Sequence, residues 1–202
     1  MMRMVRFSRR VGYSALAMVL LVSVGSSRAM AQGDHDHVIT PPQKLTAEQK
    51  SKAGALVKAV RDITAGFQTP DSLPEGYGLL FGCVSGGDLG AMGVHFVNLA
   101  LVQDGAIERS TPEIVLYEPL PNGGMRITGA DYLVYAADWD AKHPHDTPQL
   151  DGQLFHLFDS PNRFGLPAFY TLHVWAWKDN PNGTFTNWNP NVSCDAFAPP
   201  QS

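Results

Sequence analysis

The sequence has few charged residues and only two cysteines, and it lacks the motifs of two large enzyme classes. Charged residues make up 17% and apolar residues 44% of its 202 positions, a balance that excludes an intrinsically disordered chain. The glycine-rich stretch 76–93 contains no GxxxxGKS or GxxxxGKT sequence, which excludes a P-loop there. Cys83 stands where the G-x-S-x-G motif around Ser85 requires glycine, so a serine-hydrolase elbow is also missing.

Basic residues are scarce once the N-terminal leader is set aside. Four arginines within residues 1–10 precede the apolar stretch 11–25, and residues 29–31 (AMA) form a small-x-small cleavage site. This pattern predicts a signal peptide over residues 1–31. Its removal takes away five basic residues and leaves ten against 19 acidic ones, a net charge of −9. We therefore expect an exported protein, periplasmic or secreted, with no nucleic-acid partner and no membrane contact after leader removal.

The two cysteines, Cys83 and Cys194, both follow the predicted leader. In an oxidising compartment an even pair favours a disulfide. The bridge would span 111 positions, and closing a loop of that length stabilises the fold by roughly 4–5 kcal/mol in the chain-entropy account. The alternative interpretation is a thiol nucleophile or a metal ligand.

The chain after the leader divides into a tail and one domain. Residues 32–45 form a flexible polar tail, in which the DHDH segment 34–37 can gather a divalent ion weakly. Residues 46–202 are expected to form a single globular α+β domain.

We predict an N-terminal amphipathic helix packed on a curved, mainly antiparallel β-sheet. Thr46 and Gln49 form a capping box for a helix that ends near Ala65. The residues after it favour strands, and the turn sequence PNGG at 121–124 predicts a hairpin, whereas 138–151 is predicted to be a polar loop. The predicted strands are 92–102, 113–120, 125–137, 154–158 and 168–177.

Strand alternation places four ionisable residues on apolar, inward faces. These residues are His95, Glu118, Asp131 and His173. The apolar residues of the same faces include Leu99 and Leu101 for His95, Ile114 for Glu118, Ile127 and Leu133 for Asp131, and Phe169 for His173.

Burial of an unpaired carboxylate costs several kcal/mol, so these four groups are expected to satisfy one another or to bind a cation. Two histidines with one or two carboxylates suit zinc, iron, manganese or copper as a divalent ion. The alternative is that each inward histidine is an ordinary core residue, and His156 is a lesser candidate for the site.

Aromatic residues suggest a second kind of site. Tyr132, Phe169, Trp175 and Trp177 are candidates for the lining of an apolar ligand pocket. The same residues also suit ordinary core packing.

Several segments together resemble a family of uncharacterised exported bacterial proteins. They are Gly90–Asn98 (GAMGVHFVN), Pro112–Tyr117 (PEIVLY), Gly129–Tyr132 (GADY), Phe169–Trp177 (FYTLHVWAW), Asn180–Gly183 (NPNG) and Trp188–Pro190 (WNP). The resemblance covers about residues 55–195. It implies one exported domain and no particular reaction. Members of the family often have Glu at the position of Asp131, which keeps a carboxylate there.

Three functions fit these observations. The first is a protein that binds a metal ion or small ligand through the inward histidines and carboxylates. The second is a metal-dependent enzyme of hydrolase or oxygenase type, in which the ion activates water or binds a substrate oxygen. The third is a module without metal that holds an apolar small molecule. The sequence leaves open whether the protein is an enzyme.

Overall fold

The computed structural model describes residues 44–198, which form three α-helices, eight strands and two short 3-10 helices. In chain order the elements are α1 (Ala47–Thr64), the 3-10 helix Pro70–Ser72, β1 (Tyr77–Ser85), the 3-10 helix Gly87–Leu89, β2 (Ala91–Asn98), α2 (Leu99–Asp104), β3 (Ile114–Pro119), β4 (Met125–Tyr135), α3 (Ala136–Lys142), β5 (Gln149–Leu150), β6 (Gln153–Leu154), β7 (His156–Phe158) and β8 (Phe169–Val174). The predicted signal peptide 1–31 and the DHDH segment 34–37 lie outside these residues. Within the described part, no helix is long and apolar enough to cross a membrane.

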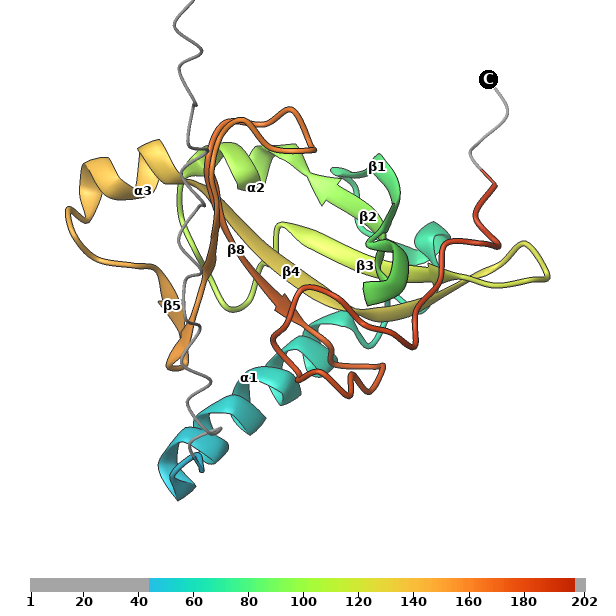
Figure 1. Ribbon diagram of the computed structural model, residues 1–202, viewed down its shortest axis with the longest axis horizontal. Coiled ribbons are helices and arrows are strands. Elements are labelled where there is room, and N and C mark those ends of the chain that lie inside the picture. The colour runs from blue at the N-terminus through green and yellow to red at the C-terminus, as the bar shows by residue number, and fades with distance from the viewer. Residues whose placement is uncertain (1–43, 199–202) are drawn as a thin grey trace, which may run out of the picture. The chain divides into compact units, whose positions relative to one another are not determined.

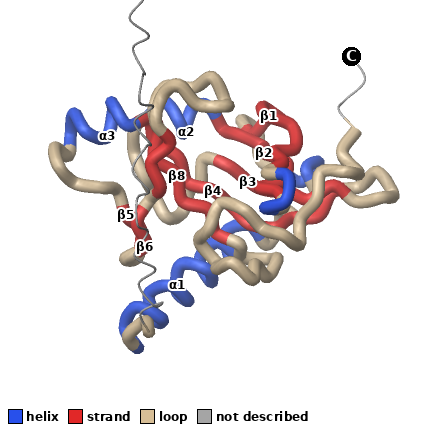
Figure 2. Tube along the Cα trace, viewed as in Figure 1, coloured by secondary structure: helices blue, strands red, loops and turns tan. Residues whose placement is uncertain are grey.

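Six strands form one sheet in the order β1-β2-β3-β4-β8-β7, and every neighbouring pair is antiparallel. β5 and β6 pair separately. Figure 2 shows the strands of the large sheet side by side, with α1 and α2 on either side of them. This architecture confirms the predicted mixture of helix and strand and the mainly antiparallel sheet. The predicted hairpin turn is also present, since the Leu120 N–H donates to the Gly124 carbonyl oxygen at 2.8 Å.

Helix α1 begins at its predicted capping box. The Thr46 hydroxyl oxygen accepts from the Gln49 N–H at 3.1 Å, and the Gln49 side chain accepts from the Thr46 N–H at 2.8 Å. One side of the helix is apolar, and on that side Leu56 and Val60 are fully buried. They pack in one cluster with Tyr132 and with side chains of β8.

The two sides of the sheet are covered by different helices (Figure 1). Neighbouring residues of a strand point to opposite faces. In β4, Tyr132 packs with α1, whereas Leu133 packs with Val102 of α2. We call the two sides the α1 face and the α2 face. Both faces are covered at this place, which explains why eight consecutive residues of β4 are buried.

Three predicted strands end two to four residues earlier than expected, and one of them, 168–177, ends at Val174 as β8. β2 stops at Asn98, because the Asn98 side chain accepts hydrogen bonds from the Ala100 and Leu101 N–H groups and so caps helix α2. The prediction that Leu99 and Leu101 share the strand face of His95 is therefore wrong, because both residues belong to α2. β4 likewise stops at Tyr135, and α3 occupies part of the predicted polar loop. The glycine-rich stretch contains a full strand, β1.

A β-bulge in β4 moves Ile127 to the other face. Leu116 pairs with Gly129, but the next residue of β3, Tyr117, pairs with Ile127, so one residue of β4 is left without a partner. The extra residue reverses the alternation, and Ile127 packs with Tyr117. The prediction that Ile127 shares a face with Asp131 is wrong for this reason.

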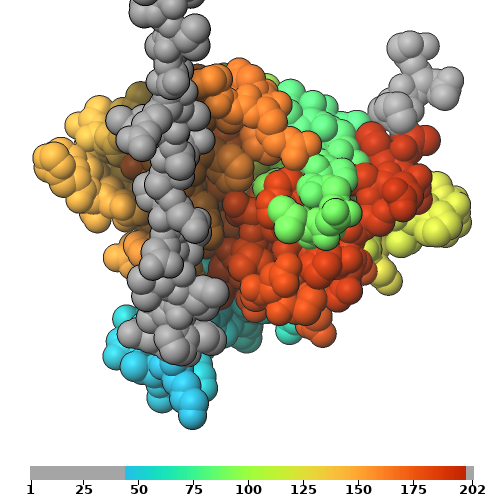
Figure 3. Space-filling view, viewed as in Figure 1, coloured from blue at the N-terminus to red at the C-terminus, as the bar shows by residue number. Residues whose placement is uncertain are grey.

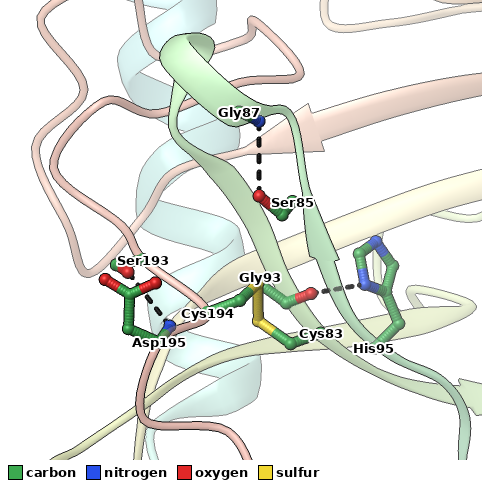
Figure 4. Close-up of a disulfide and its surroundings, with 8 residues drawn as sticks. All are labelled: Cys83, Ser85, Gly87, Gly93, His95, Ser193, Cys194 and Asp195. Atoms are coloured by element: carbon green, nitrogen blue, oxygen red, sulfur yellow. Dashed lines mark hydrogen bonds between the residues drawn. A yellow bond between two sulfur atoms is a disulfide. The ribbon is translucent and has the colours of Figure 1, made fainter.

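Cys83 and Cys194 form a disulfide, with their Cα atoms 5.6 Å apart (Figure 4). This confirms the disulfide prediction and excludes the alternative of a free thiol or metal ligand in this state. The bridge fixes the C-terminal segment to the edge strand β1. A second link is the bridge between Ala91 and Asn189, and the space-filling view shows the C-terminal segment in red against the green segment of β1 and β2 (Figure 3).

Candidate metal centre

Three of the predicted site residues meet on the α2 face of the sheet. His95 comes from β2, Asp131 from β4 and His173 from β8, and one ligand atom of each lies within 4.8 Å of the others. Their exposed fractions are 4%, 2% and 2%. Asp131 is paired with His173 across β4 and β8, and the rings of His95 and His173 have centroids 6.0 Å apart. We call these three residues the His–Asp–His group.

Asp131 is held by a neighbour on the adjacent strand. The Thr171 hydroxyl donates to Asp131 Oδ1 at 2.5 Å. Thr171 lies two positions before His173 on β8, so the strand alternation directs both side chains to the same face. Burial raises the pKa of Asp131 to about 6, and the bond from Thr171 acts in the opposite direction. Asp131 is therefore mostly ionised above about pH 6.

His95 is oriented by its own strand. Its Nδ1 lies 3.0 Å from the Gly93 carbonyl oxygen (Figure 4). A carbonyl oxygen only accepts, so Nδ1 carries the proton and Nε2 carries the lone pair that a metal needs. Gly93 has φ +96°, and a Cβ there would lie 2.4 Å from the Tyr117 carbonyl oxygen. Only glycine fits this position, which fixes the carbonyl that orients His95.

His173 has no hydrogen-bond partner within the described residues, although both of its ring nitrogens are buried. Its Nδ1 lies 3.5 Å from Asp131 Oδ1, which is longer than a normal hydrogen bond. A buried nitrogen without a partner costs about 1–3 kcal/mol. The ring is flanked instead by Trp175, with a centroid distance of 6.1 Å. This uncompensated cost is the feature of the group that most needs a ligand to explain it.

Burial keeps both histidines neutral. It lowers the pKa of His95 to about 4, with the nearby His173 acting in the same direction. It lowers the pKa of His173 to about 3. At neutral pH the group therefore consists of two neutral imidazoles and one carboxylate, which is the protonation state that metal ligands require.

Glu118 does not join this group. Its carboxylate is paired with Arg126 and with Lys178, whose Nζ lies 2.7 Å from Oε2. It also lies four positions along β3 from Ile114, the residue paired with Asp131, which is about 13 Å of strand. Glu118 is buried, as predicted, but two cations next to it compensate its charge.

A small cavity adjoins the His–Asp–His group. It has a volume of about 20 Å³, room for one molecule of about the size of water. Thr171 and the three residues of the group supply its polar edge. Its other lining residues are Phe81, Met92, Ile114, Leu133, Phe158, Phe164, Leu166 and Phe169.

The four aromatic residues predicted to line a ligand pocket are not brought together. Phe169 lines the cavity. Tyr132 is buried on the α1 face, and Trp175 packs with Val192 and the disulfide segment. Trp177 is 39% exposed and donates to the Thr64 hydroxyl on α1. The aromatic lining comes instead from phenylalanines of β1, β7 and the segment before β8, which lie in stretches without a clear strand alternation.

Glu113 is a buried acid that the sequence analysis missed. It precedes β3, and its Oε2 accepts from the Leu133 N–H at 2.9 Å. Burial raises the pKa of Glu113 to about 8. Glu113 stands at the end of a predicted strand and outside any motif, so nothing in the sequence indicated that its side chain is buried.

His156, the lesser candidate for the site, does not join the group. It lies on the edge strand β7, where it pairs with Thr171, and its side chain is exposed.

The arrangement can hold a cation through three ligands and leave a further position open toward the cavity. This is the pattern of a metal site that binds or activates a small molecule, whereas a purely structural site closes all positions. Searches against protein-family models, curated proteins and solved structures find no match for the chain. The geometry of the described residues therefore carries the functional argument.

Proposed function

We propose that the chain is an exported protein that binds one divalent transition-metal ion through His95, Asp131 and His173. One observation carries this proposal: three buried donors lie within 4.8 Å of one another, and neither ring nitrogen of His173 has a partner within residues 44–198. A cation at this place compensates the carboxylate and gives one of the two orphaned His173 nitrogens a partner at the same time.

The donor set limits the choice of ion. Two imidazoles and one carboxylate suit zinc, iron, manganese or copper, and do not suit calcium or magnesium, which prefer oxygen ligands. Ligand atoms about 2.0–2.1 Å from a tetrahedral ion lie about 3.3 Å from one another. Donor atoms that lie up to 4.8 Å apart therefore move closer by up to about 1.5 Å when an ion is bound, a movement within reach of side-chain rotation.

The short distance between the two histidine rings supports the proposal. β2 and β8 are three strand spacings apart in the sheet order, which is about 14 Å in a flat sheet. The His95 and His173 ring centroids are nevertheless only 6.0 Å apart. The two side chains therefore reach toward each other across β3 and β4, so that residues of distant strands form one site.

Export is also part of the proposal. The disulfide Cys83–Cys194 supports an oxidising compartment, periplasmic or extracellular. Residues 1–31 then act as a signal peptide, residues 32–45 as a polar tail, and residues 46–202 as one domain of the exported bacterial family that the sequence resembles. Mass spectrometry of the exported chain tests this part, because we expect its N-terminus at Gln32.

The metal content of the exported protein tests the central part. The protein is purified without a histidine tag, with and without residues 32–42, so that His35 and His37 cannot contribute. We expect close to one ion per chain in both forms, and a loss of that ion in His95→Ala and in His173→Ala. His145→Ala, an exposed histidine elsewhere, is the matched control and keeps the ion. Metal retained by His173→Ala, or no metal after supplementation, contradicts the proposal.

The cavity favours a second candidate function, a metal-dependent enzyme of hydrolase or oxygenase type. A binding protein needs no space beside its ion, whereas a catalyst needs a place for the reacting molecule. Turnover of a substrate panel by the metal-loaded protein, lost in Asp131→Asn, supports the enzyme. Full metal binding without turnover of any substrate favours the binding protein.

A further inference from the structure

We propose that a gas-sized apolar molecule, with dioxygen as the chemical example, reaches the His–Asp–His group through a row of apolar cavities on the α2 face. That the molecule reaches a metal ion at the inner end of the route rests on the proposed function. The route itself rests on the cavities alone.

The row has three parts. The first is the cavity of about 20 Å³ beside the His–Asp–His group. The second has a volume of about 50 Å³ and shares four lining residues with the first. The shared residues are Phe81, Ile114, Leu133 and Leu166. The third is a surface groove that shares Leu80, Val97 and Leu99 with the second. Movement of a few side chains therefore connects the site to solvent.

The lining of the middle cavity selects for an apolar molecule. Apart from Tyr135, every side chain around it is aliphatic or phenyl. A buried water needs two to four polar partners, and cavities without them stay dry and accept apolar guests such as xenon. The outer groove carries two half-exposed leucines, Leu80 and Leu99, each 46% exposed. An ion or a sugar loses its hydration on this route and gains no partner in return.

The volumes select for a small molecule. About 10–15 Å³ of such space holds one water, so the inner cavity holds one small molecule and the middle one about three to five. Drug-sized ligands occupy about 300–1,000 Å³. A diatomic gas fits both criteria.

Paramagnetic relaxation by dissolved dioxygen tests the route on the metal-free mature protein. Methyl groups that dioxygen visits relax faster under oxygen pressure. We expect relaxation of the Ile114 and Leu133 methyls, buried beside the cavities, at least about threefold faster than that of Leu56 and Val60, which are equally buried in the cluster under α1. Equal relaxation of the two sets overturns the proposal.

Two variants of one residue change the route in opposite directions. Leu166 lies in the segment between β7 and β8 and borders both inner cavities. Leu166→Phe fills them and lowers the dioxygen effect at Ile114, whereas Leu166→Ala enlarges them and raises it. Either variant suffices if the other does not fold. The same dioxygen effect at Ile114 in a folded variant as in wild type overturns the route. Displacement of dioxygen from the cavities by n-hexane overturns the proposed limit to gas-sized molecules.

Metal binding is measured separately in the same variants. Dioxygen access in a protein that binds no metal removes the proposed function and leaves the route intact. One bound ion in a protein whose cavities exclude dioxygen overturns the route and leaves the proposed function intact.

Discussion

Replacement of Asp131 by asparagine is expected to stabilise the metal-free protein while it abolishes metal binding. Burial raises the pKa of this carboxyl from 3.8 to about 6. A raised pKa means that the carboxyl contributes its full stability below about pH 3.8 and loses it as the pH rises through about 6. Two pKa units correspond to about 3 kcal/mol. Asparagine has nearly the same shape, accepts the Thr171 hydrogen bond and carries no charge to bury.

Denaturant unfolding of metal-free wild type and Asp131→Asn at a series of pH values measures this effect. The variant's advantage should grow by about 2–3 kcal/mol between about pH 4 and pH 8. Asp195→Asn, at an exposed position, is the matched control for the exchange of an aspartate for an asparagine. With zinc at about 100 times its Kd the wild type gains about 2.7 kcal/mol, and the variant gains far less. A pH-independent difference, or a variant less stable at pH 8 than at pH 4 relative to wild type, refutes the reasoning.

Three further changes follow from the same structure. Glu113→Gln should raise the unfolding free energy relative to wild type, and by more at about pH 9 than at about pH 5. The reason is that burial raises the pKa of Glu113 to about 8, so the buried carboxyl destabilises the wild type once it is ionised. Urea titrations of both proteins at the two pH values check this. Replacing Cys83 and Cys194 together by serine should lower the unfolding free energy by about 4–5 kcal/mol, measured against the oxidised wild type under non-reducing conditions. Gly93→Ala should lower the melting temperature and weaken metal binding together, because a Cβ there lies 2.4 Å from the Tyr117 carbonyl oxygen; an unchanged melting temperature would contradict it.

The three residues of the candidate site could be predicted from the sequence because strand alternation is a simple rule. His95, Asp131 and His173 stand on predicted strands, and each was expected on the inward face. The structure brings all three to the α2 face. The rule needs no knowledge of which strands are neighbours.

The misses have local physical causes. The alternation fails at the bulge between Ile127 and Gly129, because the extra residue depends on pairing with β3. It also fails after Asn98, where a side-chain cap starts a helix. Glu118 was assigned to the site because its buried position was visible in the sequence, but its pairing with the distant Lys178 was not.

The cavity beside the His–Asp–His group could not be predicted from strand alternation. Phe81, Phe158 and Phe164 come from an irregular edge strand, a three-residue strand and a loop, none of which has a period to read. Of the four predicted aromatic residues, Tyr132 stands on β4 and points to the α1 face. Trp175 and Trp177 lie beyond the end of β8 at Val174, where strand alternation no longer applies.

A cobalt(II) titration of the metal-free mature protein tests the central claim most directly, because its visible absorption reports the ligand geometry. The account predicts saturable bands at one cobalt per chain, competed by zinc. It predicts at least about 100-fold weaker binding in His173→Ala, since loss of even an indirect partner of a ligand costs 10–100-fold. His145→Ala should bind as wild type does. No saturable absorption, or the same titration for wild type and His173→Ala, would contradict a metal centre at the His–Asp–His group.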